Sequence, residues 1–240
     1  MVDGSTSKAL HRIDAEMSNG RLCMETVCRC VASLPHDTDV AGFCRAATQA
    51  VRDEYARRNV DISYLAANPS ERATASAVVY SAARGEVWLV GDCQCLADSV
   101  FYNNPKPAEA TLAAIRSEAV RHALDNGCTV DDIMADDPGR RVIMPQLKAA
   151  CAGQNTEYAV IDGFDIPVNL VKVVDVSACN EIVLASDGYP KLMPTLGQSE
   201  EQLETLLKLD PLCINLYKAT KGIRHGASSF DDRSYVRIKV

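Results

Sequence analysis

Residues 181–189 read EIVLASDGY, an apolar segment of strand length that runs directly into Asp187. Residues 86–96 read EVWLVGDCQCL and repeat this arrangement, with Asp92 after the apolar segment. Branched aliphatic and aromatic residues favour strands, and a glycine beside an aspartate favours a tight turn. Both stretches therefore predict a strand that delivers a carboxylate at its end.

The regions around these strands alternate between helical and strand patterns. Residues 73–81 are rich in small and branched residues and are joined to 86–90 by a glycine-containing turn, which predicts a hairpin. Residues 22–34 and 40–58 carry apolar residues at helical spacing, and Asp39 is a suitable N-cap for the second helix. Further helices are expected at 107–124, after Thr129 and at 200–208, and strands at 86–97 (one continuous strand), 158–161, 168–176, 181–185 and 234–240.

The order of these elements predicts an α+β fold, an αββα sandwich of two antiparallel sheets flanked by helices. No repeat or low-complexity linker divides the sequence, so we expect a single domain over residues 1–240. The helical middle, roughly residues 105–152, is expected to be an insert. Within it, residues 140–152 are compatible with either helix or irregular structure.

The composition limits the class of protein. The 240 residues carry a net charge of −7, which argues against a nucleic-acid-binding surface, because such a surface needs clustered positive charge. No apolar run approaches the roughly 18 residues of a membrane span, and the opening MVDGSTSK lacks the pattern of a secretory signal. We therefore expect a cytoplasmic protein without nucleic-acid or membrane partners.

The ten cysteines are scattered through apolar segments. Cys28 and Cys30 form a CxC pair, as do Cys93 and Cys95, and no CxxC or HxxxH pattern accompanies them, which argues against a structural zinc site. Free cysteines behave as small hydrophobic residues. We expect reduced, mostly buried thiols in a reducing compartment.

Four aspartates share one local pattern, at the end of an apolar strand or just before one: Asp3, Asp92, Asp187 and Asp231. Strand ends in a packed sandwich converge on a common edge, where carboxylates repel one another unless a cation lies between them. Hard divalent cations prefer such oxygen ligands. Asp162 is also followed by glycine, and we assign that pair to an ordinary turn.

Four segments, in this order along the chain, resemble motifs of the metal-dependent serine/threonine protein phosphatases of type 2C. VDGSTS at 2–7 is similar to that family's DGHGG motif, and EVWLVGDCQCL at 86–96 to its GDSR strand. EIVLASDGY at 181–189 is similar to its SDG motif, and DDRSYV at 231–236 to its closing DN-x-T. The sequence is thus identified as resembling a divergent, bacterial-like member of that family.

The resemblance implies a two-metal centre that uses Mn²⁺ or Mg²⁺. Asp3 would bridge the two cations, with the carbonyl of Gly4 on one of them. Asp187 and Asp231 would hold the first cation, and Asp92 would lie near a third, weaker position. The reaction implied is hydrolysis of a phosphorylated protein or a small phosphate ester by a metal-activated water, without a covalent protein nucleophile.

The sequence also departs from the family pattern. Ser5 stands where the family has a histidine that protonates the leaving group, and Gln94 stands where GDSR has its arginine. The family carries an acidic pair and a phosphate-binding arginine on a strand before DGHGG, and this sequence starts at Met1, so the resemblance implies an N-terminally incomplete member. Lys8 is a candidate substitute contact for the phosphate.

Two functions therefore stay open at this point. The first is an active metal-dependent phosphohydrolase, and the second is a catalytically silent binding or regulatory module with the same fold, because fold does not imply function. N-terminal-nucleophile hydrolases also have an αββα sandwich. These enzymes need Thr, Ser or Cys at the mature N-terminus, whereas Met1 and Val2 precede Asp3 here. We therefore discount this class.

Overall fold

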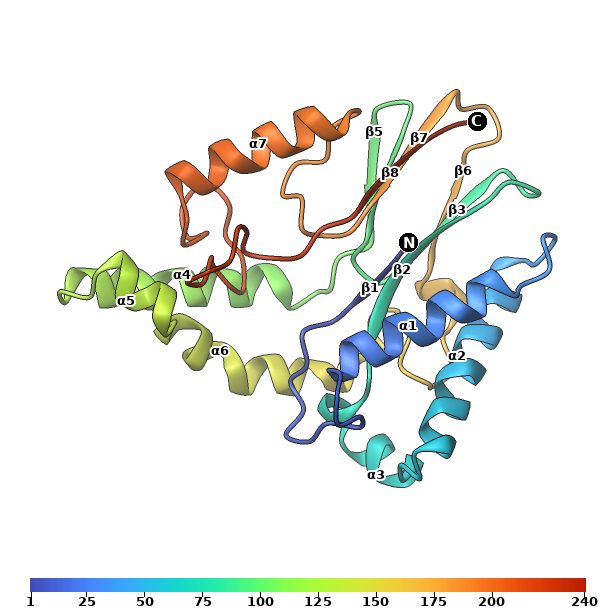
Figure 1. Ribbon diagram of the computed structural model, residues 1–240, viewed down its shortest axis with the longest axis horizontal. Helices are drawn as coiled ribbons and strands as arrows, with labels where there is room; N and C mark the ends of the chain where they lie inside the picture. Colours follow the sequence, from blue (N-terminus) through green and yellow to red (C-terminus); the bar gives the residue numbers. More distant parts are fainter.

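The computed structural model describes residues 1–240 and contains two four-stranded antiparallel sheets with helices outside both (Figure 1). The expected α+β class and its two antiparallel sheets are confirmed. The first sheet has the order β1 (Val2–Gly4), β2 (Ala75–Ser81), β3 (Glu86–Val90), β6 (Lys172–Asp175). The second sheet has the order β5 (Val100–Asn103), β4 (Gln94–Ala97), β7 (Glu181–Ala185), β8 (Tyr235–Lys239).

Helices begin where the sequence supplies side-chain caps. Ser18 accepts a hydrogen bond from Arg21 N at the start of the first helix, and Thr129 forms a capping box with Asp132. No helix is both long enough and apolar enough to span a membrane. The helices are α1 (Asn19–Ala32), α2 (Val40–Arg57), α3 (Ile62–Ala67), α4 (Glu109–Asp125), α5 (Val130–Ala135), α6 (Pro138–Ala149) and α7 (Leu196–Leu209).

Successive side chains of each strand point to opposite faces of its sheet, and those on the inner faces form the core between the two sheets. In β2 and β3, Val78 and Leu89 face the second sheet, where they pack in one cluster with Cys95 of β4 and Leu184 of β7. All four side chains are buried. The sheets are therefore packed face to face, as the αββα prediction requires.

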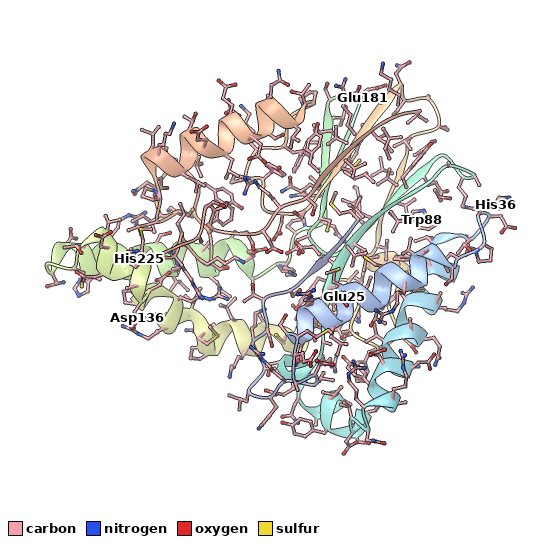
Figure 2. The ribbon with its side chains drawn as sticks, viewed as in Figure 1. Glu25, His36, Trp88, Asp136, Glu181 and His225 are labelled. Atoms are coloured by element: carbon pink, nitrogen blue, oxygen red, sulfur yellow. The ribbon has the colours of Figure 1, made fainter.

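The opposite faces of the sheets pack against helices. Trp88 of β3 points away from the second sheet and stacks on Phe43 of α2, with ring centroids 5.9 Å apart (Figure 2). On the other side, Val183 of β7 packs in one cluster with Leu203 of α7. Figure 1 shows the consequence: α1 and α2 cover the first sheet, α7 covers the second, and α4 to α6 project from one end.

The expectation of one continuous strand over 86–97 is wrong. β3 ends at Val90 and belongs to the first sheet, whereas β4 starts at Gln94 and belongs to the second. The chain changes sheet at Gly91, which has φ +79°, a backbone conformation that glycine adopts without steric cost. A Cβ there would lie 2.3 Å from Ser76 Oγ, so only glycine fits this crossing.

Other boundaries also differ from the sequence patterns. Residues 158–161 form only isolated bridges, from Tyr158 to Gln154 and from Ile161 to Ala75. Residues 168–176 divide into a 3₁₀ turn (Val168–Leu170) and β6. The undecided stretch from Arg140 is largely helical, within α6. β5 is not apparent from the sequence pattern; it pairs with β4 through a turn that holds Asp98 and Ser99 at positive φ.

Candidate metal centre

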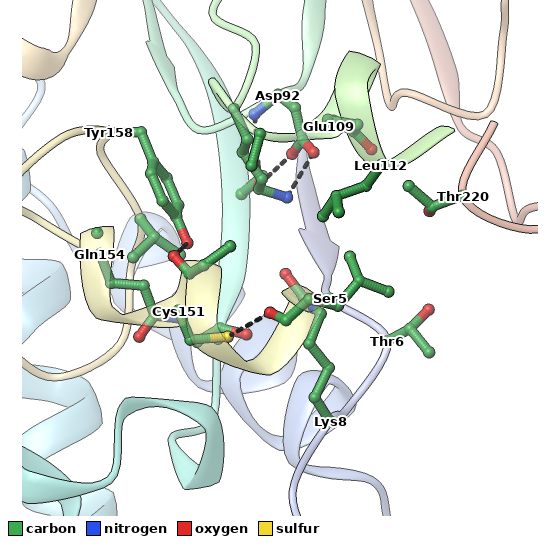
Figure 3. Close-up of a pocket in the computed structure, with 18 of the residues that line it drawn as sticks. Ser5, Thr6, Lys8, Asp92, Glu109, Leu112, Cys151, Gln154, Tyr158 and Thr220 are labelled. Atoms are coloured by element: carbon green, nitrogen blue, oxygen red, sulfur yellow. Dashed lines mark hydrogen bonds and ion pairs between the residues drawn. The ribbon is translucent and has the colours of Figure 1, made fainter. Parts of the chain in front are cut away.

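The four aspartates singled out in the sequence, with Gly4 and Lys8, line one cavity of about 300 Å³. The cavity lies at an end of the sandwich, where the sheets meet α4 and the segment that follows α6 (Figure 3). Asp3 comes from β1, Asp92 from the crossing after β3, Asp187 from the turn after β7, and Asp231 from the loop before β8. Four distant parts of the chain thus deliver carboxylates to one place.

Asp3 is positioned by the pairing of β1 with β2. Val2 packs with the helices on the first sheet, so the alternation of the strand turns Asp3 toward the opposite face. In the antiparallel register, Asp3 lies directly across from Ser76. The following Gly4 passes close to α1, and a Cβ at this position would lie 2.4 Å from the carbonyl oxygen of Gly20. This packing alone requires glycine after Asp3.

Asp92 is held by two partners. Ser76 Oγ donates a hydrogen bond to Asp92 Oδ1 at 2.5 Å, and the ammonium of Lys106 pairs with Asp92 Oδ2. Burial by itself would raise the pKa of Asp92, but the charge of Lys106 and these two hydrogen bonds outweigh it and lower the pKa. Asp92 is therefore an ionised carboxylate with a cation already beside it.

Asp3 and Asp187 form a pair of interacting carboxyl groups. Burial raises the pKa of Asp187 well above its usual range, and the charges of Asp92 and Asp3 raise it further. Burial also raises the pKa of Asp3, to about 6, although a hydrogen bond with Asp187 opposes the shift. Without a cation, the pair favours a shared proton over two negative charges.

Asp231 is paired with Lys221, whose ammonium also donates a hydrogen bond to Thr6 Oγ1 at 3.2 Å. Burial raises the pKa of Asp231 to about 7, partly offset by Lys221. The lysine thus ties the loop before β8 to the segment that follows β1.

One carboxylate of this centre was not recognised in the sequence. Glu109, at the start of α4, offers an oxygen that lies within 4.8 Å of oxygens from Asp92 and Asp187, while those two also lie within 4.8 Å of each other. Figure 3 shows Asp92 and Glu109 at the same end of the cavity. Two oxygens on opposite sides of one hard cation are about 4 to 5 Å apart, so this donor set fits Mg²⁺, Mn²⁺ or Ca²⁺.

Four cationic side chains also line the cavity: Lys8, Lys106, Arg140 and Lys221. Lys106 and Lys221 pair with carboxylates, whereas Lys8 and Arg140 have no carboxylate within 4.0 Å. Arg140 donates to the carbonyl of Thr220 at 2.9 Å. Burial lowers the pKa of both Lys8 and Arg140, and neighbouring cations lower it further. Two cations without carboxylate partners therefore face the same cavity as the aspartates.

Asp162 has the structural role assigned to it from the sequence. Its carboxylate is fully buried and contacts Arg72 Nη1 at 2.8 Å and Asn155 Nδ2 at 3.0 Å. It also accepts the backbone N–H of Phe164 at 2.9 Å, which closes the turn at Gly163. Asp162 does not line the cavity.

The cysteines are all free, and six of the ten are buried, as expected. Cys93, next to Asp92, lies in the core between the sheets, where burial raises the pKa of its thiol. A buried, protonated thiol is a poor nucleophile. Although it follows Asp92 in the sequence, Cys93 does not line the cavity.

No protein-family model matches the chain, and no curated protein sequence matches it either. Among solved structures, the chain is similar to the serine/threonine phosphatase PstP of Mycobacterium tuberculosis. The sequences are 13% identical, the match covers 87% of this chain and 90% of the phosphatase chain, and the TM-score is 0.37.

Proposed function

We propose that the chain is a metal-dependent phosphohydrolase that removes phosphate from a small phosphate ester or a phosphorylated protein. The observation that carries the proposal is the lining of one cavity of about 300 Å³. Four aspartates and Glu109 line it together with two cationic side chains that have no carboxylate partner. Glu109 forms a cation-sized set of oxygens with two of these aspartates, Asp92 and Asp187. Carboxylates suit hard divalent cations, and cations without partners suit the phosphate of a substrate.

The aspartates would hold Mn²⁺ or Mg²⁺. By the resemblance, Asp3, Asp187 and Asp231 would form the first position, with the Gly4 carbonyl and Asp3 at a second and Asp92 at a third. In the structure only Asp92, Glu109 and Asp187 bring their oxygens within 4.8 Å of one another, so the first position would require Asp3 and Asp231 to move toward Asp187. When bound, the cations supply a nucleophilic water at neutral pH and neutralise charge on the phosphoryl oxygens. The carboxylates of this chain would orient that water. Without a cation, burial raises the pKa values of Asp3, Asp187 and Asp231, and neighbouring carboxylates raise them further.

Lys8 and Arg140 would hold the phosphate. Both side chains line the cavity, and neither is neutralised by a carboxylate. The carbonyl of Thr220 fixes the Arg140 guanidinium from one side and leaves other N–H groups free for phosphate oxygens. The size of the cavity supports a small phosphate ester over the surface of a folded phosphoprotein.

Titration calorimetry with Mn²⁺, followed by release of phosphate from p-nitrophenyl phosphate, tests the proposal. We expect one Mn²⁺ to bind tightly, because Asp3, Asp187 and Asp231 supply three carboxylates to the first position and the second has only Asp3 and Gly4. We expect weak hydrolysis that depends on Mn²⁺ and disappears on chelation. A chain that binds no Mn²⁺ would contradict the proposal.

A catalytically silent module that binds phosphate esters is the second candidate. It is supported by Ser5, which lines the cavity and is a poor general acid, and by Lys221, whose pairing with Asp231 occupies a carboxylate of the first position. The same experiment separates the two candidates. Tight binding of Mn²⁺ and of a phosphate ester without any release of phosphate would favour the silent module.

A further inference from the structure

Lys106 occupies an unusual place for a lysine. Its ammonium pairs with Asp92. Asp92 is one member of the cation-sized set of carboxylates, and Glu109 and Asp187 are the other two. Burial by itself would lower the pKa of Lys106, but the charges of Asp92, Glu109 and Asp187 raise it. One positive charge beside these three carboxylates is therefore already supplied by the chain, through the pairing of Lys106 with Asp92.

The backbone holds Lys106 in this place. Pro105 and Pro107 flank it, and each proline restricts its own φ and the residue before it. Asn104 donates from its side chain to the carbonyls of Leu89, at 3.3 Å, and Leu170, at 2.9 Å, which fixes the segment to the end of β3. A lysine on such a segment loses less entropy on pairing than one on a mobile loop.

Glu109 belongs to the same local arrangement. Its backbone N–H donates to the carbonyl of Lys106 at 3.2 Å, so a single turn before α4 presents the cation and one of its three carboxylates together. The other two carboxylates arrive from the crossing after β3 and the turn after β7. One segment of the insert thus supplies both a ligand for a divalent cation and a competitor for it.

We propose that the Lys106 ammonium is a tethered counter-ion that occupies the Asp92–Glu109–Asp187 position, so that a divalent cation binds there only by displacing it. This inference rests on the proposed function, since it concerns a cation position of the same centre. Displacement breaks a charge-assisted hydrogen bond to the partly buried carboxylate of Asp92, which weakens the cation affinity of this position. Once displaced, the ammonium is free to contact an anionic ligand in the cavity.

Lys106→Met tests the competition, with Lys106→Arg and Lys148→Met as controls. Calorimetry of the wild-type chain is expected to show one tight Mn²⁺. Lys106→Met should show a second, with affinity raised on the order of tenfold or more, because its carboxylates stay uncompensated until the cation binds. Lys106→Arg keeps the positive charge and should behave as wild type. Lys148→Met removes a positive charge from α6, outside the cavity, and should leave Mn²⁺ affinity unchanged.

A second measurement uses the wild-type chain alone. Reductive methylation of lysines, followed by mass spectrometry of peptides, reports the reactivity of each amine. Mn²⁺ should raise the labelling of Lys106 several-fold, because displacement breaks its ion pair, and should leave exposed Lys239 unchanged. This readout keeps the inference testable if Lys106→Met fails to fold.

The outcomes separate the inference from the proposed function. Equal Mn²⁺ binding by wild type and Lys106→Met, or Lys106 labelling that Mn²⁺ does not raise, overturns the inference and leaves the metal-dependent function standing. Absence of Mn²⁺ binding by both folded chains overturns both. A second Mn²⁺ in Lys106→Met alone supports the inference, whether or not the wild-type chain hydrolyses a phosphate ester.

Discussion

The guanidinium of Arg72 lies 2.8 Å from the carboxylate of Asp162, which is fully buried, while the arginine side chain stays 9% exposed. The guanidinium also lies over the ring of Phe164, with its central carbon 3.8 Å from the ring centroid. This Asp-Gly pair resembles the one at Asp187 in sequence and differs from it in every contact. The two aspartates are therefore a matched pair for separating structural from metal-binding roles.

Asp162→Asn should destabilise the fold without affecting the cation. The substitution leaves the largely buried Arg72 cation without its counter-charge, and such losses cost up to about 3–5 kcal/mol of the free energy of unfolding when the pair is fully buried. Urea unfolding measures this cost, and calorimetry should find unchanged Mn²⁺ affinity in the folded variant. A weaker Mn²⁺ affinity would show that Asp162 influences the centre.

Asp187→Asn should have the opposite pair of effects. Removal of a hard charged ligand should weaken Mn²⁺ binding by about tenfold or more, because few protein ligands hold the cation. Near pH 7 and without metal the variant should melt at a higher temperature than wild type, because asparagine removes the cost of keeping a buried carboxyl group protonated in the folded chain. Far-ultraviolet circular dichroism should stay unchanged. Unaltered Mn²⁺ affinity would remove Asp187 from the centre.

The stability of the metal-free chain should fall as pH rises from about 4 to about 7. Asp3 and Asp231 have pKa values raised to about 6 and about 7 in the folded chain, and Asp187 shifts in the same direction. In the unfolded chain, aspartates titrate near 3.9, so the folded state binds more protons across this interval. The stabilisation from these protons is complete below the unfolded pKa and is lost as pH passes the folded values.

Saturating Mn²⁺ should flatten this pH dependence near neutrality, because the cation stabilises the ionised carboxylates. Thermal melts from pH 4 to 8, with and without Mn²⁺, measure both curves. Asp92 contributes in the opposite sense at the acidic end, since its pKa is lowered. A metal-free chain whose stability rises between pH 5 and 7 would contradict the assigned environments of Asp3 and Asp231.

Much of the fold follows from local patterns in the sequence. β7 and the turn at Asp187 are predictable because a short apolar run before Asp-Gly specifies both the strand and its end. The crossing at Gly91 is less predictable. The segments on either side of it are both apolar and strand-like, and only the tertiary structure shows that they belong to different sheets.

The candidate centre shows a different limit. The aspartates have a local signal, an adjacent strand or glycine. Glu109 and Lys106 have none, because they meet Asp92 only after the start of α4 and the segment before it pack against the sheet ends. The sequence pattern that corresponds to this arrangement is Lys106 between two prolines, followed by Glu109 at the start of a helix. Ion pairs between distant segments depend on packing that composition and periodicity do not encode.

Arg140→Gln should weaken binding of phosphate esters while preserving the metal. Its guanidinium is anchored by the Thr220 carbonyl and has no carboxylate partner, so the free donors are available to phosphate. Loss of a hydrogen bond to a charged group costs about 1.5–3 kcal/mol, which corresponds to roughly a tenfold to hundredfold weaker affinity. Competition by inorganic phosphate in the p-nitrophenyl phosphate assay, or calorimetry if turnover is absent, measures the change.

Lys148→Gln is the matched control for Arg140, because it lies on the same helix, α6, and does not line the cavity. It should leave phosphate affinity unchanged. Equal losses in the two variants would indicate that net charge, and not a contact, governs the binding. Unchanged phosphate affinity in Arg140→Gln would remove Arg140 from the phosphate site.

Ser5→His should raise hydrolysis of alkyl phosphates more than that of p-nitrophenyl phosphate. Ser5 lines the cavity, and its backbone N–H donates to the Thr74 carbonyl, which fixes the start of the side chain. An alkoxide leaving group needs a proton, and general acids typically contribute about a hundredfold or more to such steps. The nitrophenolate is a weak base and leaves without one. The ratio of the two rates therefore isolates the protonation step from metal and phosphate binding. A parallel rise for both esters would point to altered positioning, and no change for either would show that the histidine does not reach the leaving group.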